Sequence, residues 1–98
     1  MAEQEQLFLK FLVQASVRQA KLLLQSSTPN QLIAIAEVCL NLLHGDIDSE
    51  LKKDLKAFKG VIRKLSDKRT SAAERKQVAI RKASAVQKIL RLAESLLP

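Results

Sequence analysis

Two side chains in this sequence carry the chemistry of a nucleophile and its base: the single cysteine, Cys39, and the single histidine, His44. They are five residues apart, which puts them on different faces of a helix and prevents a nucleophile–base pair. One Cys and one His do not complete a zinc site. The sequence also lacks a glycine-rich phosphate loop and the paired carboxylates of a catalytic cleft. We therefore expect a protein that is not an enzyme and that requires no metal or cofactor.

Both residues have simpler roles in a helix. His44 would meet the last carbonyls of a helix end, and Cys39 would be a small buried hydrophobe in a reducing compartment. The first residues, MAEQEQ, lack the basic start of a signal peptide, and no apolar run reaches membrane-spanning length. We expect a soluble intracellular protein with no membrane span.

The basic side chains are distributed unevenly. Residues 51–98 contain fourteen Lys and Arg against four Asp and Glu, a net charge of +10, whereas residues 1–50 contain three against six, a net charge of −3. Such asymmetry favours a polyanionic partner. The alternative is a solvated face that only keeps the protein soluble.

Four of these cations recur at helical spacing. Lys52, Lys56, Lys59 and Arg63 follow one row of a helix, about 5 to 6 Å apart along its axis, which suits contacts to a phosphate backbone. The surface is mostly Lys, and the chain has no Tyr or Trp, which argues against base readout and against stacking on unpaired bases. We therefore expect a double-stranded nucleic acid as the partner, and the sequence does not distinguish DNA from double-stranded RNA. The candidate nucleic-acid contacts are Lys52, Lys53, Lys56, Lys59, Arg63, Lys64, Lys68, Arg69, Arg75, Lys76, Arg81 and Lys82.

Composition and periodicity predict an all-α chain. Residues 29–44 would form a helix that is apolar almost all the way round, capped by Thr28 and ended by a left-handed Gly45. Such a helix belongs at the centre of a core. We predict one domain over residues 1–98, a compact four-helix bundle-like fold. Its helices are expected over 2–25, 29–44, 49–65 and 72–97.

The third predicted helix would carry a seam of apolar residues beside its basic row. A helix-turn-helix formed with the preceding helix is disfavoured, because Asp48 and Glu50 would bring negative charge to the end that enters the DNA groove. A membrane-surface role for the last helix is disfavoured because its charges cluster at one end and it has no aromatic anchor.

The first two predicted helices have more apolar surface than one packing face needs. We expect self-association as a symmetric dimer. A monomer whose first helix is deeply wrapped is the alternative.

Part of the chain resembles a known family. The runs RQAKLLLQSSTPNQLIAIAEVCLNLLHGDI and KKDLKAFKGVIRKLSDKRTS lie within about residues 18–76. They resemble a small basic protein of Maverick (Polinton) transposons and adintoviruses that has been likened to the adenovirus core protein. The resemblance rests on LNLLHG with Ile47 shortly after, and on VIRKLSDKRTS. It implies a virion or element-encoded protein that associates with packaged DNA.

The chain departs from this family after the SDKRTS segment. Family members tend to carry a dense Lys/Arg cluster and then a glycine-rich step, where this chain has AAERKQVAIRKASA with Ala83 and Ser84 about where the glycines would fall. The change removes positive charge and lets the final helix continue. We therefore expect weaker condensation of DNA with an intact helical core.

These observations predict a sequence-nonspecific DNA-binding, packaging-associated protein of a virus-like or transposon element, acting in the nucleus or a virion. The competing hypothesis is a helical interaction or oligomerisation module, a capsid or core scaffold in which the positive charge only steers association. A mobility shift on plain duplex DNA, beside light scattering of the protein alone, separates the two.

Overall fold

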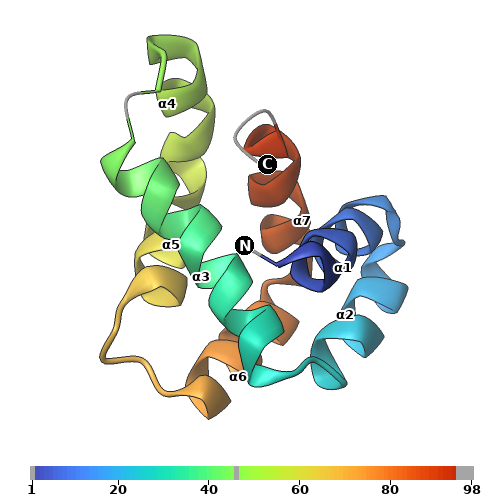
Figure 1. The fold of residues 1–98 in the computed structure, drawn as a ribbon. Coiled ribbons are helices and arrows are strands. Elements are labelled where there is room, and N and C mark those ends of the chain that lie inside the picture. The colour runs from blue at the N-terminus through green and yellow to red at the C-terminus, as the bar shows by residue number, and fades with distance from the viewer. Residues whose placement is uncertain (1, 46, 95–98) are drawn as a thin grey trace.

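The computed structural model describes residues 2–45 and 47–94, and within them it contains helices and no strand, so the predicted all-α class is confirmed (Figure 1). Its radius of gyration of 12.2 Å is close to the ~13 Å of a compact domain of about 100 residues. The elements are α1 (Glu3–Gln14), α2 (Val17–Gln25), α3 (Pro29–His44), α4 (Ser49–Leu55), the 3₁₀ helix η1 (Lys56–Phe58), α5 (Lys59–Ser66), α6 (Ala72–Arg81) and α7 (Ala83–Leu92). Among the described residues, none of these helices combines the length and apolar character needed to cross a bilayer.

The central helix has the bounds that the sequence predicts. Thr28 and Gln31 cap it reciprocally: the Thr28 hydroxyl accepts from the Gln31 N–H at 3.2 Å, and the Gln31 side chain accepts from the Thr28 N–H at 2.9 Å. The prediction that Gly45 adopts a left-handed conformation is wrong, because its φ is −75° and its backbone is extended. Glycine is favoured there for another reason: a Cβ would collide with the carbonyl oxygen of Asn41.

The predicted helix over 2–25 is interrupted at Ala15 and Ser16. Both residues have extended backbone, and Ser16 begins α2 with its own capping box. Its hydroxyl accepts from the Gln19 N–H, and the Gln19 side chain accepts from the Ser16 N–H, both at 3.1 Å. The Ser-x-x-Gln signal of a new helix start was present in a segment whose apolar pattern continues through it.

The third and fourth predicted helices are also broken. The predicted 49–65 helix consists of α4, η1 and α5 in succession, with the Asp48 carboxylate capping α4 by accepting from the Leu51 N–H at 2.7 Å. The predicted 72–97 helix bends at Lys82, which separates α6 from α7, and residues 95–97 of that prediction lie outside the described residues. The predicted four-helix bundle is not confirmed, because several short helices pack in different directions.

The core lies where α3 meets its neighbours. We call α4, η1 and α5 together the α4–α5 arm. Figure 1 shows α3 between this arm and the α1–α2 pair, and α3 makes its most extensive contacts with α5. The apolar seam of the third predicted helix faces this core, since Leu55, Ile62 and Leu65 are buried. The largest fully buried side chains are Leu9, Leu12, Leu24, Ile35, Leu65, Ile89, Leu90, Val86 and Cys39.

Side chains of α7 donate hydrogen bonds to the backbone carbonyls at the C-terminal end of α1. The Gln87 amide donates to the carbonyl oxygens of Leu12 at 3.0 Å and Ala15 at 2.6 Å, and the Arg91 guanidinium donates to that of Val13 at 3.1 Å. The last carbonyls of a helix have no partner within the helix. Gln87 is only 5% exposed, so its amide supplies these carbonyls with a partner in place of water.

We predict that Gln87→Met lowers the free energy of unfolding by about 1–3 kcal/mol, because it keeps the length of the side chain but leaves buried carbonyls without a donor. Gln77→Met, at an exposed position of α6, is the matched control and should change stability by less than about 0.5 kcal/mol. Urea unfolding followed by circular dichroism measures both. Equal effects of the two variants would contradict the role of Gln87.

Candidate nucleic-acid interface

The twelve predicted contact residues lie on one continuous stretch of structure that runs from α4 to the start of α7. Six belong to α4, η1 and α5, two to the turn that follows, and four to α6 and its C-terminal cap. Ten of the twelve are exposed, whereas Arg75 and Lys76 are half-buried.

The principal row is open to a ligand. The side chains of Lys52, Lys56, Lys59 and Arg63 are exposed, and none of them forms a hydrogen bond or ion pair with the described residues. Three of them, Lys52, Lys56 and Lys59, line one side of a groove between the end of α3 and the α4–α5 arm. No carboxylate of residues 2–45 or 47–94 therefore forms an ion pair with these four cations.

Two other predicted contacts form surface ion pairs. The Lys64 ammonium lies 3.6 Å from the Glu74 carboxylate, and the Arg69 guanidinium lies 3.1 Å from that of Asp67. The hydrogen bonds from Arg69 hold the pKa of the Asp67 carboxyl below its usual range. Exposed pairs of this kind contribute little energy, so a phosphate can displace the carboxylate.

Arg75 and Lys76 are committed to contacts within the protein. The Arg75 guanidinium donates to the carbonyl oxygens of Leu65 at 2.9 Å, Asp67 at 3.2 Å and Thr70 at 3.4 Å, and so ties α6 to the end of α5. The Lys76 ammonium donates to the carbonyl oxygen of Gln25 at 3.2 Å, at the end of α2. These two cations add to the positive field but are poorly placed for direct contacts.

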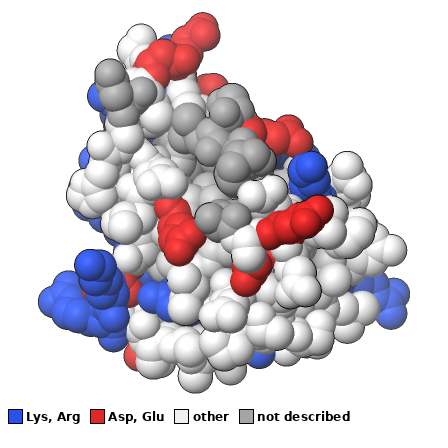
Figure 2. Space-filling view, viewed as in Figure 1, with Lys and Arg blue, Asp and Glu red and all other residues white. Residues whose placement is uncertain are grey.

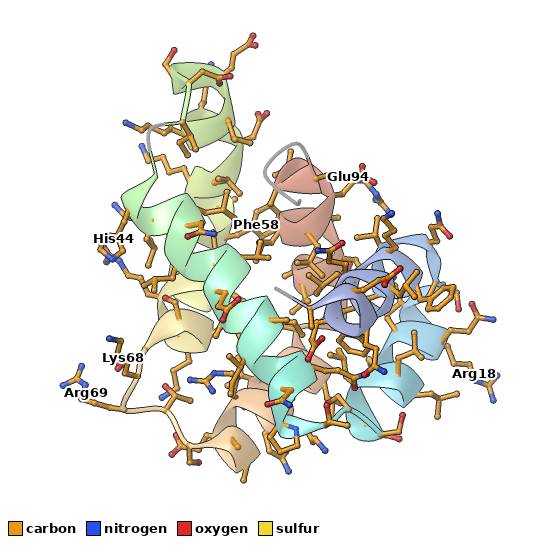
Figure 3. The ribbon with its side chains drawn as sticks, viewed as in Figure 1. Arg18, His44, Phe58, Lys68, Arg69 and Glu94 are labelled. Atoms are coloured by element: carbon orange, nitrogen blue, oxygen red, sulfur yellow. The ribbon has the colours of Figure 1, made fainter. Side chains whose placement is uncertain are left out.

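Acidic and basic side chains occupy different parts of the face shown in Figure 2. On the face shown in Figure 2, acidic side chains gather over α1, α3 and the tip of α4, while Lys and Arg lie mainly along the edges. Lys68 and Arg69, labelled in Figure 3, project beyond the same edge as His44. A polyanion would approach this edge and avoid the acidic face.

Cys39 and His44 lie in different environments. Burial raises the pKa of the Cys39 thiol to about 12, partly offset by the positive charge of Arg75, so the thiol is neutral near pH 7. His44 is exposed at the end of α3. Among residues 2–45 and 47–94, no cluster of three or more His, Cys, Asp or Glu side chains is arranged to hold a metal ion.

A second candidate surface is apolar and lies on α1 and α2. The sequence indicated it only through the wide apolar surface of the first predicted helices. Phe11 and Leu22 are each 59% exposed, and Leu7 is 46% exposed. Phe11 and Leu22 line a shallow groove between α1 and α2 together with Ala15 and Leu23. We call this region, Leu7, Phe11, Ala15, Leu22 and Leu23, the α1–α2 apolar patch.

We predict that Arg75→Lys lowers the free energy of unfolding by about 1–2 kcal/mol, because an ammonium cannot reproduce the planar fork that reaches three carbonyls. Arg81→Lys is the matched control, since Arg81 is exposed on the same helix and has no hydrogen bond or ion pair with the described residues. Chemical denaturation measures both variants. If Arg75→Lys is as stable as Arg81→Lys, the guanidinium does not hold the α5–α6 turn.

Comparisons with known proteins do not identify the chain. No protein-family model, curated protein or solved structure matches it. The resemblance to the Maverick and adintovirus protein therefore stays a prediction from the sequence.

Proposed function

We propose that this protein binds duplex DNA without sequence preference, with Lys52, Lys56, Lys59 and Arg63 as its principal phosphate contacts. The observation that carries the proposal is that all four side chains are exposed and unpaired among the described residues. Unpaired cations keep their full attraction for phosphate and release counterions from the DNA on binding.

The length of the row supports contacts to several phosphates. Arg63 follows Lys52 by eleven positions along α4, η1 and α5, which is about 18 Å at ~1.5 Å per α-helical residue and ~2.0 Å per 3₁₀ residue. B-DNA carries one phosphate charge per ~1.7 Å of its axis, so four cations over this length meet a dense line of charge. Lys53, Lys68, Arg81 and Lys82 extend the surface as exposed cations, and Lys64 and Arg69 do so by exchanging carboxylate partners for phosphates.

The chemistry of the row favours contacts to the backbone over contacts to bases. An ammonium is a compact charge that cannot make the bidentate contacts by which Arg, Asn or Gln read base edges. Three of the four principal residues are Lys. Affinity should therefore vary little with DNA sequence.

The biological setting that we propose follows the resemblance of residues 18–76. The protein would associate with packaged DNA of a virus-like or transposon element and act in the nucleus or a virion. Because the segment after Thr70 lacks the dense Lys/Arg cluster of that family, we propose association with DNA and not strong condensation.

We predict that the quadruple variant Lys52→Glu, Lys56→Glu, Lys59→Glu and Arg63→Glu loses binding to random-sequence duplex DNA by at least about 100-fold, because four attractive contacts become repulsive. The fold should keep its melting temperature within a few degrees, since all four side chains are exposed. Fluorescence anisotropy at 50 to 200 mM salt measures affinity. The four principal contacts alone predict a slope of log K against log salt of about −3 to −4 for the wild type, and each further phosphate contact makes that slope steeper.

The matched control carries the same change of charge elsewhere. Lys10→Glu, Arg18→Glu, Lys21→Glu and Lys88→Glu also reverse four exposed cations that have no hydrogen bond or ion pair with the described residues. This control should lose less than about tenfold in affinity. Equal losses in the two variants would mean that net charge alone attracts DNA, and unaltered affinity in the first would contradict the proposed contacts.

The exposed α1–α2 apolar patch favours a second candidate function, a helical oligomerisation or scaffold module. Phe11 and Leu22 are large apolar side chains that remain mostly exposed. Contiguous exposed apolar surface on a small domain marks an interaction site. A symmetric dimer, or a capsid protein seated on this patch, would cover it.

For this candidate we predict that the wild type sediments as a dimer at micromolar concentration and that Phe11→Ser with Leu22→Ser returns it to a monomer of 10.9 kDa. Ile33→Ser, at an exposed apolar position of α3 outside the patch, should leave the dimer intact. Analytical ultracentrifugation measures the mass. A monomeric wild type would contradict self-association through the patch.

A further inference from the structure

The groove between α3 and the α4–α5 arm combines two kinds of surface. Its floor is aliphatic, made by Leu42, Leu43 and Ile47, and its rim carries the three ammonium groups of Lys52, Lys56 and Lys59. Leu43 and Ile47 are only half-buried. The volume of the groove is about 340 Å³, within the range of small-molecule sites.

Duplex DNA accounts for only one of these two surfaces. Phosphates can neutralise the lysines, but a charged backbone has no apolar surface to place against leucine and isoleucine. The accessible part of the aliphatic floor would stay in contact with water or be covered by polar groups. A ligand with a negative group at one end and a hydrocarbon body would match the rim and the floor together.

We propose that this groove binds a fatty acid, with the carboxylate among Lys52, Lys56 and Lys59 and the alkyl chain along Leu42, Leu43 and Ile47. Lysine stems contribute to such a site as well, because their methylene groups cover apolar surface while the ammonium stays at the rim. No carboxylate among the described residues forms an ion pair with these three lysines, which leaves their ammonium groups open to a ligand carboxylate in this part of the structure.

This inference is independent of the proposed DNA binding, although it uses three of the same lysines. Because a bound carboxylate would occupy cations that otherwise meet phosphate, a fatty acid should compete with DNA. If the protein binds the ten-carbon fatty acid decanoate but not DNA, only the proposed function is contradicted. If it binds DNA but not decanoate, only this inference is overturned.

The test is a titration of the full-length ¹⁵N-labelled protein with octanoate, decanoate and dodecanoate, each below its micelle concentration and at fixed ionic strength. We expect Kd to fall about fourfold for each added methylene, as burial of a CH₂ group predicts. Amide shifts should be largest near Leu42, Leu43 and Ile47. Decanol, which has the same chain length without the charge, should bind at least tenfold more weakly than decanoate.

Two matched triple variants complete the test. Lys52→Gln with Lys56→Gln and Lys59→Gln should weaken decanoate binding by at least tenfold. Lys53→Gln with Lys68→Gln and Lys82→Gln removes the same charge from exposed positions outside the groove and should change Kd by less than twofold. Equal weakening by the two variants, equal affinity for decanol, no dependence on chain length, or shifts concentrated at Phe11 and Leu22 would each overturn the proposal.

Discussion

The burial of α3 is the constraint on which the rest of the structure depends. Its apolar positions point in nearly every direction, and Leu32, Ala34, Ile35, Val38, Cys39 and Leu42 are buried. One packing face cannot cover such a helix, so α1, α5 and α6 contact it from different directions. This requirement explains why short helices at several angles replace a parallel bundle, and why the lysine-bearing α4–α5 arm is fixed against the end of α3.

Several short helices have more helix ends than a few long ones, and the last backbone carbonyls at some of these ends accept hydrogen bonds from long polar side chains. Gln87 and Arg91 donate to the last carbonyls of α1, and Arg75 donates to those at the end of α5 and in its following turn. The contacts of Gln87 and Arg91 link elements far apart in sequence, whereas those of Arg75 join consecutive helices. Each of these contacts gives a buried or half-buried carbonyl a protein donor. Polar groups therefore help to define how these helices join, beside the apolar core.

The sequence predicted the features that caps and periodicity mark clearly, and it missed breaks within an apolar pattern and contacts that the fold brings together. The bounds of α3 and the exposure of the principal basic row follow from caps and periodicity. The break at Ser16 was missed because the apolar pattern runs through it, although the Ser16 and Gln19 pair that starts α2 is visible in the sequence. The commitment of Arg75 could not be predicted, since its carbonyl partners are brought to it by the turn between α5 and α6. The bend at Lys82 has neither Pro nor Gly to mark it.

The same geometry determines what the basic row can bind. Lysines on a helix fully surrounded by water would form a simple electrostatic surface, indifferent to the shape of the anion. Here Lys52, Lys56 and Lys59 stand beside half-buried Leu43 and Ile47, because the end of α3 lies against the arm. An anion that covers this apolar surface while it meets the ammonium groups gains both kinds of interaction. Arg63, on the same row but outside the groove, lacks this apolar neighbourhood. Under the two proposals, Lys52, Lys56 and Lys59 would serve both an amphiphilic anion and phosphate, whereas Arg63 would meet phosphate alone. This difference depends on the packing of the arm against α3, which the charge pattern of the sequence does not contain.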